Sequence, residues 1–317
     1  MKPEKPKTIH IVLTYHCNMR CIHCEFWKIK PEKEVGLSDW KKIIDDIYNW
    51  LGNNTVRIKI AGGEPAVKVF FYELMQYIKE KGFYLGITSN GTVFSERDIK
   101  FLCDIGINEI NISLDTLDRK RYIKIRGKDE FDRVLQNLMC FKKYTKVTSI
   151  NLSPTIMEVN SDEITELVRF AIKENFWITF QAVFNTFGTE YYAGWYKDFA
   201  LFPRNIEVIE KAVREVIAYK DVYRQIGNSK EQLLTMIEYF RDPGKNHNME
   251  CNAGNTDIGI DNVGNLLLCF NLNPVGNLLE RRIDELFYSK EADIIREEIK
   301  SCPRECKLLN CVFPFSD

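Results

Sequence analysis

The chain has 317 residues, of which 45% are hydrophobic and 28% are charged, with ordinary numbers of glycine and proline. These proportions predict one large globular domain with a smaller one attached. Because the formal net charge is only −1, the chain has no overall field that attracts phosphate backbones or anionic lipid. We therefore expect neither nucleic acid nor a membrane as a partner.

No apolar run reaches the roughly 18 residues that a membrane helix needs. The lysine-rich start, residues 1–7, has no apolar signal-peptide region behind it, so we expect a cytoplasmic protein. Eight of the ten cysteines fall into three spaced groups, which in a cytoplasmic protein indicates metal binding rather than disulfides. Cys103 and Cys140 lie among apolar neighbours and are expected to be ordinary packed residues.

A predicted strand at residues 9–14 is followed at once by a Cys-x-x-x-Cys-x-x-Cys loop. The loop supplies three thiols within eight residues, those of Cys17, Cys21 and Cys24. Iron–sulfur clusters usually take four cysteine ligands, so a loop with three leaves one iron open to another ligand. A closed zinc site is the alternative, with His16 or His23 as the fourth ligand.

Five more strands are predicted, alternating with helices. The strands are expected at residues 56–61, 84–89, 109–114, 149–156 and 177–183. The helices are expected at residues 40–51 after a Ser38 cap, 69–81, 95–104, 131–144 and from Ser161 onward. The alternation implies parallel strands joined by right-handed crossovers. An open or partial α/β barrel fits best, with its chemistry at the C-terminal strand ends, although a doubly wound sheet would show the same alternation.

Glycines and polar residues follow the second, third and fourth predicted strands. Gly62 and Gly63 permit close approach of the backbone to a ligand, and Glu64 offers an acceptor for an ammonium group. The later strand ends and the next connection supply further polar side chains, those of Ser89, Asn90, Ser113, Asp115 and Arg126. Taken alone, Asn-Gly is first of all a turn signal and an isolated arginine is usually solvated.

In this order, the cysteine loop and the strand-end residues resemble the radical S-adenosylmethionine (SAM) superfamily through about residue 183. The resemblance implies that the three loop cysteines hold a 4Fe-4S cluster and that the Gly-Gly-Glu motif contacts the SAM amino group. It also implies SAM ribose contacts from Ser89, Asn90, Ser113 and Asp115, and a SAM carboxylate contact from Arg126. His23 stands where many relatives carry an aromatic residue, a departure that leaves the ligand set unchanged.

From residue 184 the alternation ends and aromatic residues crowd into nineteen positions. They are Phe184, Phe187, Tyr191, Tyr192, Trp195, Tyr196, Phe199 and Phe202, with Gly188 and Gly194 between them. The segment leaves the C-terminal end of the last strand, where it would cover the barrel mouth and shape a pocket. Packing between two domains explains it equally well. Two helices are predicted next, at residues 205–220 and 229–240.

The remaining cysteines follow a linker at residues 241–244, and they are Cys251, Cys269, Cys302, Cys306 and Cys311. Residues 257–268 predict a hairpin that turns at 262–264 and brings its flanking cysteines together. The C-x12-G-x4-C spacing and the terminal cysteines resemble SPASM and twitch extensions, which hold auxiliary clusters. One auxiliary 4Fe-4S cluster is expected, held by Cys251, Cys269, Cys306 and Cys311, with Cys302 as a substitute for one of the last two. A zinc site is the alternative.

The expected fold is a partial (β/α)6 TIM-like barrel in residues 1–190, a helical and aromatic connecting segment in 191–245, and a small cysteine-rich α+β domain of the twitch or SPASM type in 246–317. The resemblance implies reductive cleavage of SAM to a 5′-deoxyadenosyl radical, which abstracts hydrogen from a substrate C–H bond. The auxiliary cluster would assist oxidation or rearrangement. The resemblance also implies an external electron donor such as flavodoxin or ferredoxin.

Three kinds of function remain open. A small polar metabolite, such as a sugar or a nucleotide-linked sugar, is slightly favoured as substrate over a ribosomally made peptide, because only about eight residues precede the first strand and leave no room for a leader-binding domain. Molybdopterin-precursor synthases typically end in Gly-Gly, whereas this chain ends Phe-Ser-Asp, which disfavours that activity. A non-catalytic metal-binding scaffold is disfavoured by the three loop cysteines together with Glu64.

Overall fold

The computed structural model describes residues 3–30, 33–185, 190–248 and 251–306. Its main sheet has the strand order β11-β10-β9-β1-β2-β3-β4-β5-β7. From β1 onward the strands are parallel and occur in chain order, at Thr8–Thr14 (β1), Arg57–Gly62 (β2), Tyr84–Ser89 (β3), Glu109–Ile112 (β4), Ser149–Leu152 (β5) and Trp177–Ile178 (β7). This sequential order confirms the partial barrel, because a doubly wound sheet reverses its strand order at a switch point.

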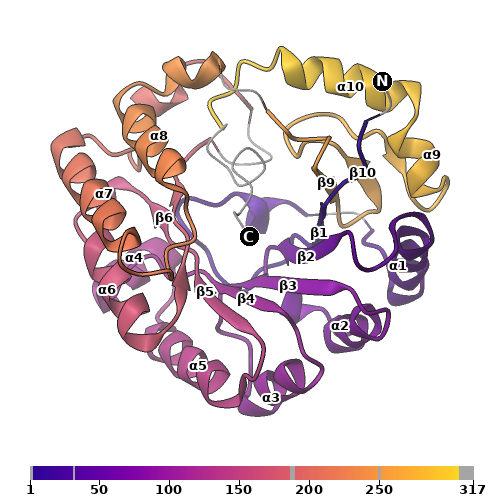
Figure 1. Ribbon diagram of the computed structural model, residues 1–317, viewed down its shortest axis with the longest axis horizontal. Helices are drawn as coiled ribbons and strands as arrows, with labels where there is room; N and C mark the ends of the chain where they lie inside the picture. The colour runs from indigo at the N-terminus through magenta and orange to yellow at the C-terminus, as the bar shows by residue number, and fades with distance from the viewer. Residues whose placement is uncertain (1–2, 31–32, 186–189, 249–250, 307–317) are drawn as a thin grey trace.

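Helices connect the strands and form an arc around the outside of the sheet (Figure 1). They are α1 (Leu37–Leu51), α2 (Phe71–Glu80), α3 (Glu96–Asp104), α4 (Arg119–Arg126), α5 (Phe131–Tyr144) and α6 (Ile164–Glu174). The short 3-10 helices are η1 (Phe26–Lys28), η2 (Pro65–Val67), η3 (Glu158–Asn160), η4 (Trp195–Lys197) and η5 (Pro243–Asn248). Ile9 and Ile58 on the strands and Ile47 on α1 are fully buried, so the apolar core lies between the strands and the helices.

Two predicted strands are each divided in the structure. The segment 149–156 forms β5 and β6 (Thr155–Ile156), and 177–183 forms β7 and β8 (Gln181–Ala182); β6 and β8 pair in a separate two-stranded sheet. Pro154 lies at the first break and has no N–H for a continuing ladder. The predicted Ser38 cap was wrong, because α1 begins one residue earlier with Gly36 at its N-cap.

The C-terminal segment extends the barrel sheet. Strand β9 (Asp257–Ile260) pairs in parallel with β1, β10 (Asn265–Leu267) pairs antiparallel with β9, and β11 (Gly276–Asn277) pairs with β10. The predicted hairpin is therefore confirmed, and its turn contains Gly264 at φ +89°. The predicted domain boundaries stay a prediction, although one continuous sheet contains strands from both sides of residue 246.

Four helices complete the described fold: α7 (Ile206–Lys220), α8 (Lys230–Arg241), α9 (Ile283–Phe287) and α10 (Lys290–Lys300). The side chains of Asn205 and Ser229 cap α7 and α8. None of the helices in the described part of the chain combines the length and apolar character needed to cross a lipid bilayer.

Much of the aromatic segment serves packing. The Trp195 ring lies within 6.0 Å, centroid to centroid, of Tyr196, Phe199 and Phe202, and Phe202 continues the contact to Phe240 of α8. Such ring pairs add stability beyond the area that they bury. These contacts support the packing explanation for this part of the segment. Phe187 and Gly188 lie outside the described residues.

Candidate active site

A cavity of about 1210 Å³ occupies the interior of the barrel. Its lining includes cysteines from both ends of the chain, namely Cys17, Cys21, Cys24, Cys251, Cys269 and Cys306. Phe184, at the start of the aromatic segment, also lines it. The fold thus brings the first cysteine loop and three of the C-terminal cysteines to one cavity.

The cysteine loop is clamped to the end of α4. The backbone N–H groups of Arg20 and Ile22 donate to the carbonyls of Arg126 and Ile125, at 3.1 and 2.9 Å. Gly127 ends the helix at φ +75°, and a Cβ there would lie 2.7 Å from the Arg20 carbonyl oxygen. A glycine is therefore needed where loop and helix meet, and this contact fixes the position of the thiols.

Gly62 and Gly63 permit a close approach, but it is an approach to the cysteine loop. A Cβ on Gly62 would lie 2.3 Å from the carbonyl oxygen of Thr14, and one on Gly63 would lie 2.4 Å from that of His16. The Gly63 N–H donates to Thr14 and the Glu64 N–H donates to His16, both at 2.8 Å. The two glycines also line the cavity, so they shape its wall from below the loop.

Glu64 is fully buried, and its carboxylate is hydrogen-bonded to other residues of the protein. Its carboxylate accepts bonds from the Ser89 hydroxyl at 3.0 Å and from the Asn90 backbone N–H at 2.8 Å. Burial raises its pKa to about 7, against the lowering effect of these bonds. The side chain braces the adjoining ends of β2 and β3, which present Ser89 and Asn90 to the cavity.

The eight residues predicted to contact SAM occupy one region. Six of them line the cavity: Gly62, Gly63, Ser89, Asn90, Ser113 and Arg126. The other two, Glu64 and Asp115, are 0% and 1% exposed and lie behind the wall. Asp115 pairs with Arg126 at 2.6 Å and accepts a bond from the Thr155 N–H at 2.9 Å. Asp115 therefore positions the arginine, and its predicted ribose contact has no support from this arrangement.

The first cysteine group suits a cationic iron cluster. Burial raises the pKa of the Cys17 thiol to about 11 and that of Cys24 above its usual value, so a cation is needed to favour the thiolates. The Asn90 amide nitrogen lies 3.8 Å from the Cys17 sulfur, and an Arg126 nitrogen lies 3.6 Å from the Cys21 sulfur. Such donors stabilise the negative charge of thiolate ligands.

The same wall keeps polar atoms available to a bound molecule. Among the residues that the structure describes, His23 Nδ1 and Arg126 Nε are buried without a hydrogen-bond partner. Burial also lowers the pKa of His23 to about 4, which favours the neutral ring. These residues therefore fit a polar ligand such as SAM beside the cysteine loop.

The zinc alternative fits the thiols less well. Within the described residues, no three His, Cys, Asp or Glu side chains are grouped closely enough to hold one metal ion. A tetrahedral zinc site with Zn–S bonds of about 2.3 Å holds its sulfurs roughly 3.8 Å apart. The described thiols therefore give no support to a single zinc ion, and Cys311 of the second group lies outside the described residues.

The second cysteine group contains four described thiols. Burial, together with the nearby charges of Cys251 and Cys302, raises the pKa of Cys269 to about 11 and that of Cys306 to about 12. Both nitrogens of Asn271 approach this group, the backbone N–H at 3.4 Å from the Cys269 sulfur and the amide at 3.9 Å from that of Cys306. Cys302 is thus near enough to act electrostatically on both thiols, whereas Cys311 lies outside the described residues.

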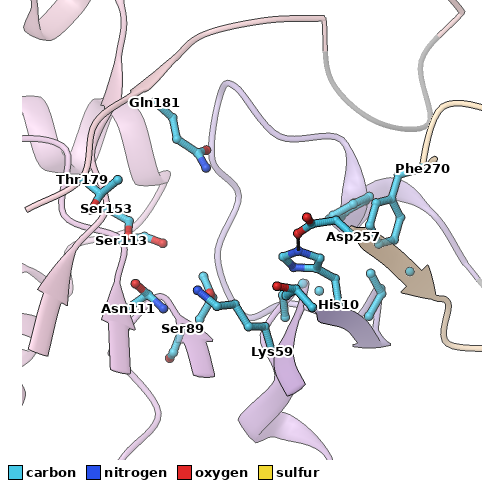
Figure 2. A pocket seen from close by; sticks show the side chains of 18 of the residues that line it. His10, Lys59, Ser89, Asn111, Ser113, Ser153, Thr179, Gln181, Asp257 and Phe270 are labelled. Atoms are coloured by element: carbon cyan, nitrogen blue, oxygen red, sulfur yellow. Dashed lines mark hydrogen bonds and ion pairs between the residues drawn. The ribbon is translucent and has the colours of Figure 1, made fainter. Parts of the chain in front are cut away.

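A polar interior was missed by the sequence analysis (Figure 2). His10 Nε2 lies 3.1 Å from Asp257, and Lys59 lies 3.3 Å from Glu109. A chain of side-chain hydrogen bonds continues across β4, β5 and the end of β7, through Asn111, Asn151 and Thr179. The available signal was alternation, because isoleucines and polar residues alternate along β1, β2 and β4, and alternate side chains face opposite sides of a sheet.

The fold and site define a class: a parallel α/β barrel with a three-cysteine loop directly after its first strand and a hollow, polar interior. A family model described as "Radical SAM superfamily" matches residues 11–171, about half of the chain. The chain belongs to the radical SAM superfamily and is an enzyme. Members of this family use a 4Fe-4S cluster and SAM.

Curated relatives match over the first part of the chain. A probable GTP 3′,8-cyclase of Pyrococcus abyssi is 34% identical over 170 residues, which is 53% of this chain and 53% of the relative. The Fe-coproporphyrin III synthase of Methanosarcina barkeri is 33% identical over 140 residues, which is 43% of this chain and 34% of the relative. The chain therefore spans about half the length, or less, of the curated relatives that it matches.

Solved structures match over most of the chain. Streptococcus suis SuiB bound to S-adenosylmethionine superposes with a TM-score of 0.72 at 18% identity, covering 92% of this chain and 68% of SuiB. The structure named native anSMEcpe with bound AdoMet gives a TM-score of 0.68 at 17% identity, covering 91% and 82%. At these identities the likeness shows the fold alone.

Proposed function

We propose that this chain cleaves SAM reductively and abstracts a hydrogen atom from a small polar metabolite held in the barrel cavity. Cys17, Cys21 and Cys24 hold the 4Fe-4S cluster, and SAM lies along the wall that carries Gly63, Asn90 and Arg126. The observation that carries the proposal is the cavity itself, because it joins the three-cysteine loop to an interior of about 1210 Å³ that also contains polar side chains.

When bound, the cluster and SAM supply a 5′-deoxyadenosyl radical, which is the group that abstracts hydrogen. The chain's own residues supply placement. Arg126 and Asn90 direct donors at the thiol sulfurs, and Asp115 and Glu64 hold these two residues in place from behind the wall. The barrel holds the substrate in one orientation and excludes water from the reacting atoms.

The proposal includes one auxiliary 4Fe-4S cluster that assists oxidation or rearrangement of the substrate. Cys251, Cys269 and Cys306 are three of its ligands, and Cys311 or Cys302 is the fourth; the charges of Cys251, Cys269 and Cys302 all act on the Cys306 thiol. Cys251, Cys269 and Cys306 line the same cavity as the first loop, which supports a second site next to the substrate. An external donor such as flavodoxin or ferredoxin supplies the electron.

A ribosomally made peptide is the second candidate substrate. SuiB has been crystallised with its precursor peptide and superposes over 92% of this chain, which favours a peptide to the extent that fold implies substrate. GTP is a third candidate, because the relatives named GTP 3′,8-cyclases match the first part of the chain. Neither likeness identifies the cavity residues that would select the substrate, and a shared fold does not imply a shared substrate.

Anaerobic reconstitution tests the proposal. The parent protein is expected to bind about eight iron and about eight sulfide ions per chain and to form 5′-deoxyadenosine when dithionite and SAM are added. Changing Cys17, Cys21 and Cys24 to Ala together should abolish this product and leave about four iron ions. The control is Cys140→Ala, a cysteine on the outer helix α5. Bound zinc without SAM cleavage would instead indicate a metal-binding scaffold.

A further inference from the structure

We infer that the substrate is uncharged and rich in hydroxyl or amide groups, because the cavity sets a wall of neutral hydrogen-bonding side chains opposite cations that are already paired. The inference rests on the proposed function and narrows its substrate class. It separates this chain from an enzyme that takes a nucleoside triphosphate, which carries three or four negative charges.

Three basic side chains of the interior, those of Lys59, His10 and Arg126, each have a carboxylate beside them. Lys59 Nζ lies 3.3 Å from Glu109, and His10 Nε2 lies 3.1 Å from Asp257. The Lys59–Glu109 pair is largely shielded, since its side chains are only 14% and 12% exposed, whereas the His10 side chain is 32% exposed. At the cysteine loop, Arg126 pairs with a third carboxylate at 2.6 Å. These three pairs therefore leave little net positive charge in the cavity wall to attract an anion.

The sheet around the Lys59–Glu109 pair has room for the contact and supports it with further hydrogen bonds. Gly86 on β3 stands between the two residues in the sheet register, and a Cβ there would lie 3.4 Å from the Glu109 carboxylate. The missing side chain leaves room for the lysine to reach across β3. Asn111 and Tyr84 also donate to the same carboxylate, at 2.6 and 3.0 Å.

Glu109 is ionised in this arrangement. Burial alone would raise its pKa, but Lys59 and the donors from Asn111 and Tyr84 hold the pKa below its usual value. Lys59 therefore faces a full negative charge. A phosphate that sought this lysine would have to displace a carboxylate that three groups of the protein hold in place.

Two further basic residues of the lining lie two or three positions before Lys59 and His10, at the strand ends far from the cysteine loop. Lys7 and Arg57 stand at the starts of β1 and β2, where Lys7 is exposed and Arg57 lies 5.1 Å from the centre of the Tyr84 ring. The cysteine loop follows the opposite end of β1. A β-strand rises about 3.3 Å per residue, so these cations lie roughly 20 Å from the loop along the strand.

The opposite wall is neutral and hydrogen-bonding. It is formed by Asn111, Ser113, Asn151, Ser153, Thr179 and Gln181, which come from the second half of the barrel. Figure 2 shows Asn111, Ser113, Ser153, Thr179 and Gln181 on the side of the cavity away from His10, Asp257 and Phe270. Amides and hydroxyls both donate and accept hydrogen bonds, which suits the alternating donors and acceptors of a sugar or of a primary amide.

Direct hydrogen bonds organise this wall. The Asn151 amide donates to Asn111 Oδ1 at 2.6 Å and to the Ser153 hydroxyl at 3.1 Å, and Thr179 donates to Asn151 Oδ1 at 3.1 Å. The side chains are therefore oriented before a ligand arrives. Preorganised polar groups of this kind lose little conformational freedom when they bind a ligand, which favours affinity.

Ligand binding to the SAM-loaded, anaerobically reconstituted protein tests the inference by saturation-transfer difference NMR. The probes are the methyl glycosides of glucose, galactose, mannose and N-acetylglucosamine, with GTP as the anionic probe. We expect saturation transfer to at least one glycoside and none to GTP. Asn151→Ala, which removes the centre of the neutral wall, should weaken glycoside affinity at least about tenfold.

Glu109→Gln is the sharper variant, since it keeps the shape of the side chain and removes the charge that neutralises Lys59. It should admit GTP, which the parent protein excludes. Glu73→Gln is the matched control: Glu73 pairs with Lys41 on the outer helices and is 60% exposed, so this change should leave the parent binding pattern intact. Circular dichroism verifies that each variant is folded.

Saturation transfer to GTP in the parent protein overturns the inference, and so does the absence of transfer to every glycoside. Both results come from the parent protein, so they stand even if a variant fails to fold. The formation of 5′-deoxyadenosine is measured in the same samples. Its absence counts against the proposed function, whereas the binding pattern alone decides the substrate class.

Discussion

The Asp257 carboxylate lies 3.1 Å from Nε2 of His10, although 247 positions separate the two residues in the chain. The strands that carry them pair in parallel, from Thr8 with Asp257 to Ile11 with Ile260. The hairpin that contains β9 is flanked by one cysteine group, and β1 leads into the other. The two cysteine groups are therefore positioned by adjoining strands of one sheet.

Asp257→Ala should loosen the junction between β9 and β1. The change removes a partly buried hydrogen bond, so we expect a loss of about 1 kcal/mol in the free energy of unfolding and faster hydrogen exchange of the β9 amides. The control is Asp129→Ala, because Asp129 pairs with Arg119 at the surface and exposed ion pairs contribute little. Equal exchange rates in the two variants would contradict a role for the pair.

Most strand and helix positions were predictable because the apolar periods along β1 to β4, α1 to α3, α5 and α6 are regular. The division of two predicted strands into β5 and β6 and into β7 and β8 was less predictable. Pro154 marks the break between β5 and β6 and was a usable signal, whereas the separation of β7 from β8 follows from which strand each one pairs with. Helix α4 was missed, since it contains mostly charged residues and shows little apolar period. Tertiary contacts determine such elements.

Gly63→Ala should damage the SAM site through the backbone. The new Cβ would lie 2.4 Å from the His16 carbonyl oxygen, closer than any van der Waals contact allows, so the cysteine loop must move. We expect a loss of about 1–3 kcal/mol in stability and weaker SAM binding in equilibrium dialysis. Gly36→Ala is the matched control, because a Cβ there has no atom within 4 Å. Unchanged SAM affinity in Gly63→Ala would contradict the explanation that the close contact between Gly63 and the cysteine loop shapes the SAM site.

The candidate site was predictable only where its residues are close together in sequence. The spacing of Cys17, Cys21 and Cys24 indicated a metal site, and the contiguous Gly-Gly-Glu turn could also be recognised from the sequence. The His10–Asp257 and Lys59–Glu109 pairs join different strands, and no local pattern specifies which strands become neighbours. The physical role of Glu64 was also hidden, because its partners Ser89 and Asn90 are brought to it by the pairing of β2 with β3.

Glu34 should make the fold sensitive to acid. Its carboxylate accepts bonds from Lys68 at 2.7 Å, Thr14 at 2.6 Å and Asn262 at 3.0 Å. Burial raises its pKa, but these bonds lower it more, so the pKa in the folded state is below the ordinary value of 4.5. The folded protein thus binds this proton less tightly than the unfolded chain does. The stabilisation is present above pH 4.5 and is lost as the pH falls through the folded pKa.

Glu34→Gln is therefore expected to destabilise the protein by about 1–2 kcal/mol at pH 7. The difference from the parent should shrink as the pH falls below 4.5, where the parent carboxylate becomes protonated too. Urea unfolding of the metal-free protein at pH 7 and at pH 4 measures both effects. Glu73→Gln, at an exposed ion pair, should change little at either pH. A difference that is independent of pH would show that charge is not involved.

Glu64→Ala and Glu64→Gln distinguish two roles for this carboxylate. If it braces Ser89 and Asn90, the alanine variant leaves the buried Asn90 N–H without an acceptor, at a cost of about 1–3 kcal/mol, and SAM binding weakens as the wall shifts. Glutamine keeps an acceptor oxygen and should restore most of the SAM affinity. Equal losses in both variants would indicate that the negative charge itself meets SAM, as the family resemblance implies.

Cys302→Ala tests the ligand set of the auxiliary cluster. Because Cys302 is close enough to Cys269 and Cys306 to raise the pKa of both thiols, its loss should reduce bound iron from about eight to about four per chain. SAM cleavage should continue, since the first cluster's ligands lie in a separate loop, while substrate conversion stops. Circular dichroism is measured in parallel, because loss of a metal site can unfold the segment around it.

Cys311→Ala is the decisive companion to that variant. If Cys302 completes the set, Cys311→Ala retains about eight iron ions, and Cys140→Ala, the control on α5, does so too. If instead Cys302→Ala stays fully loaded and Cys311→Ala loses half of its iron, the fourth ligand is Cys311. The convergence of Cys302 with the other thiols would then be a matter of packing alone, and the second cluster would be completed by the end of the chain.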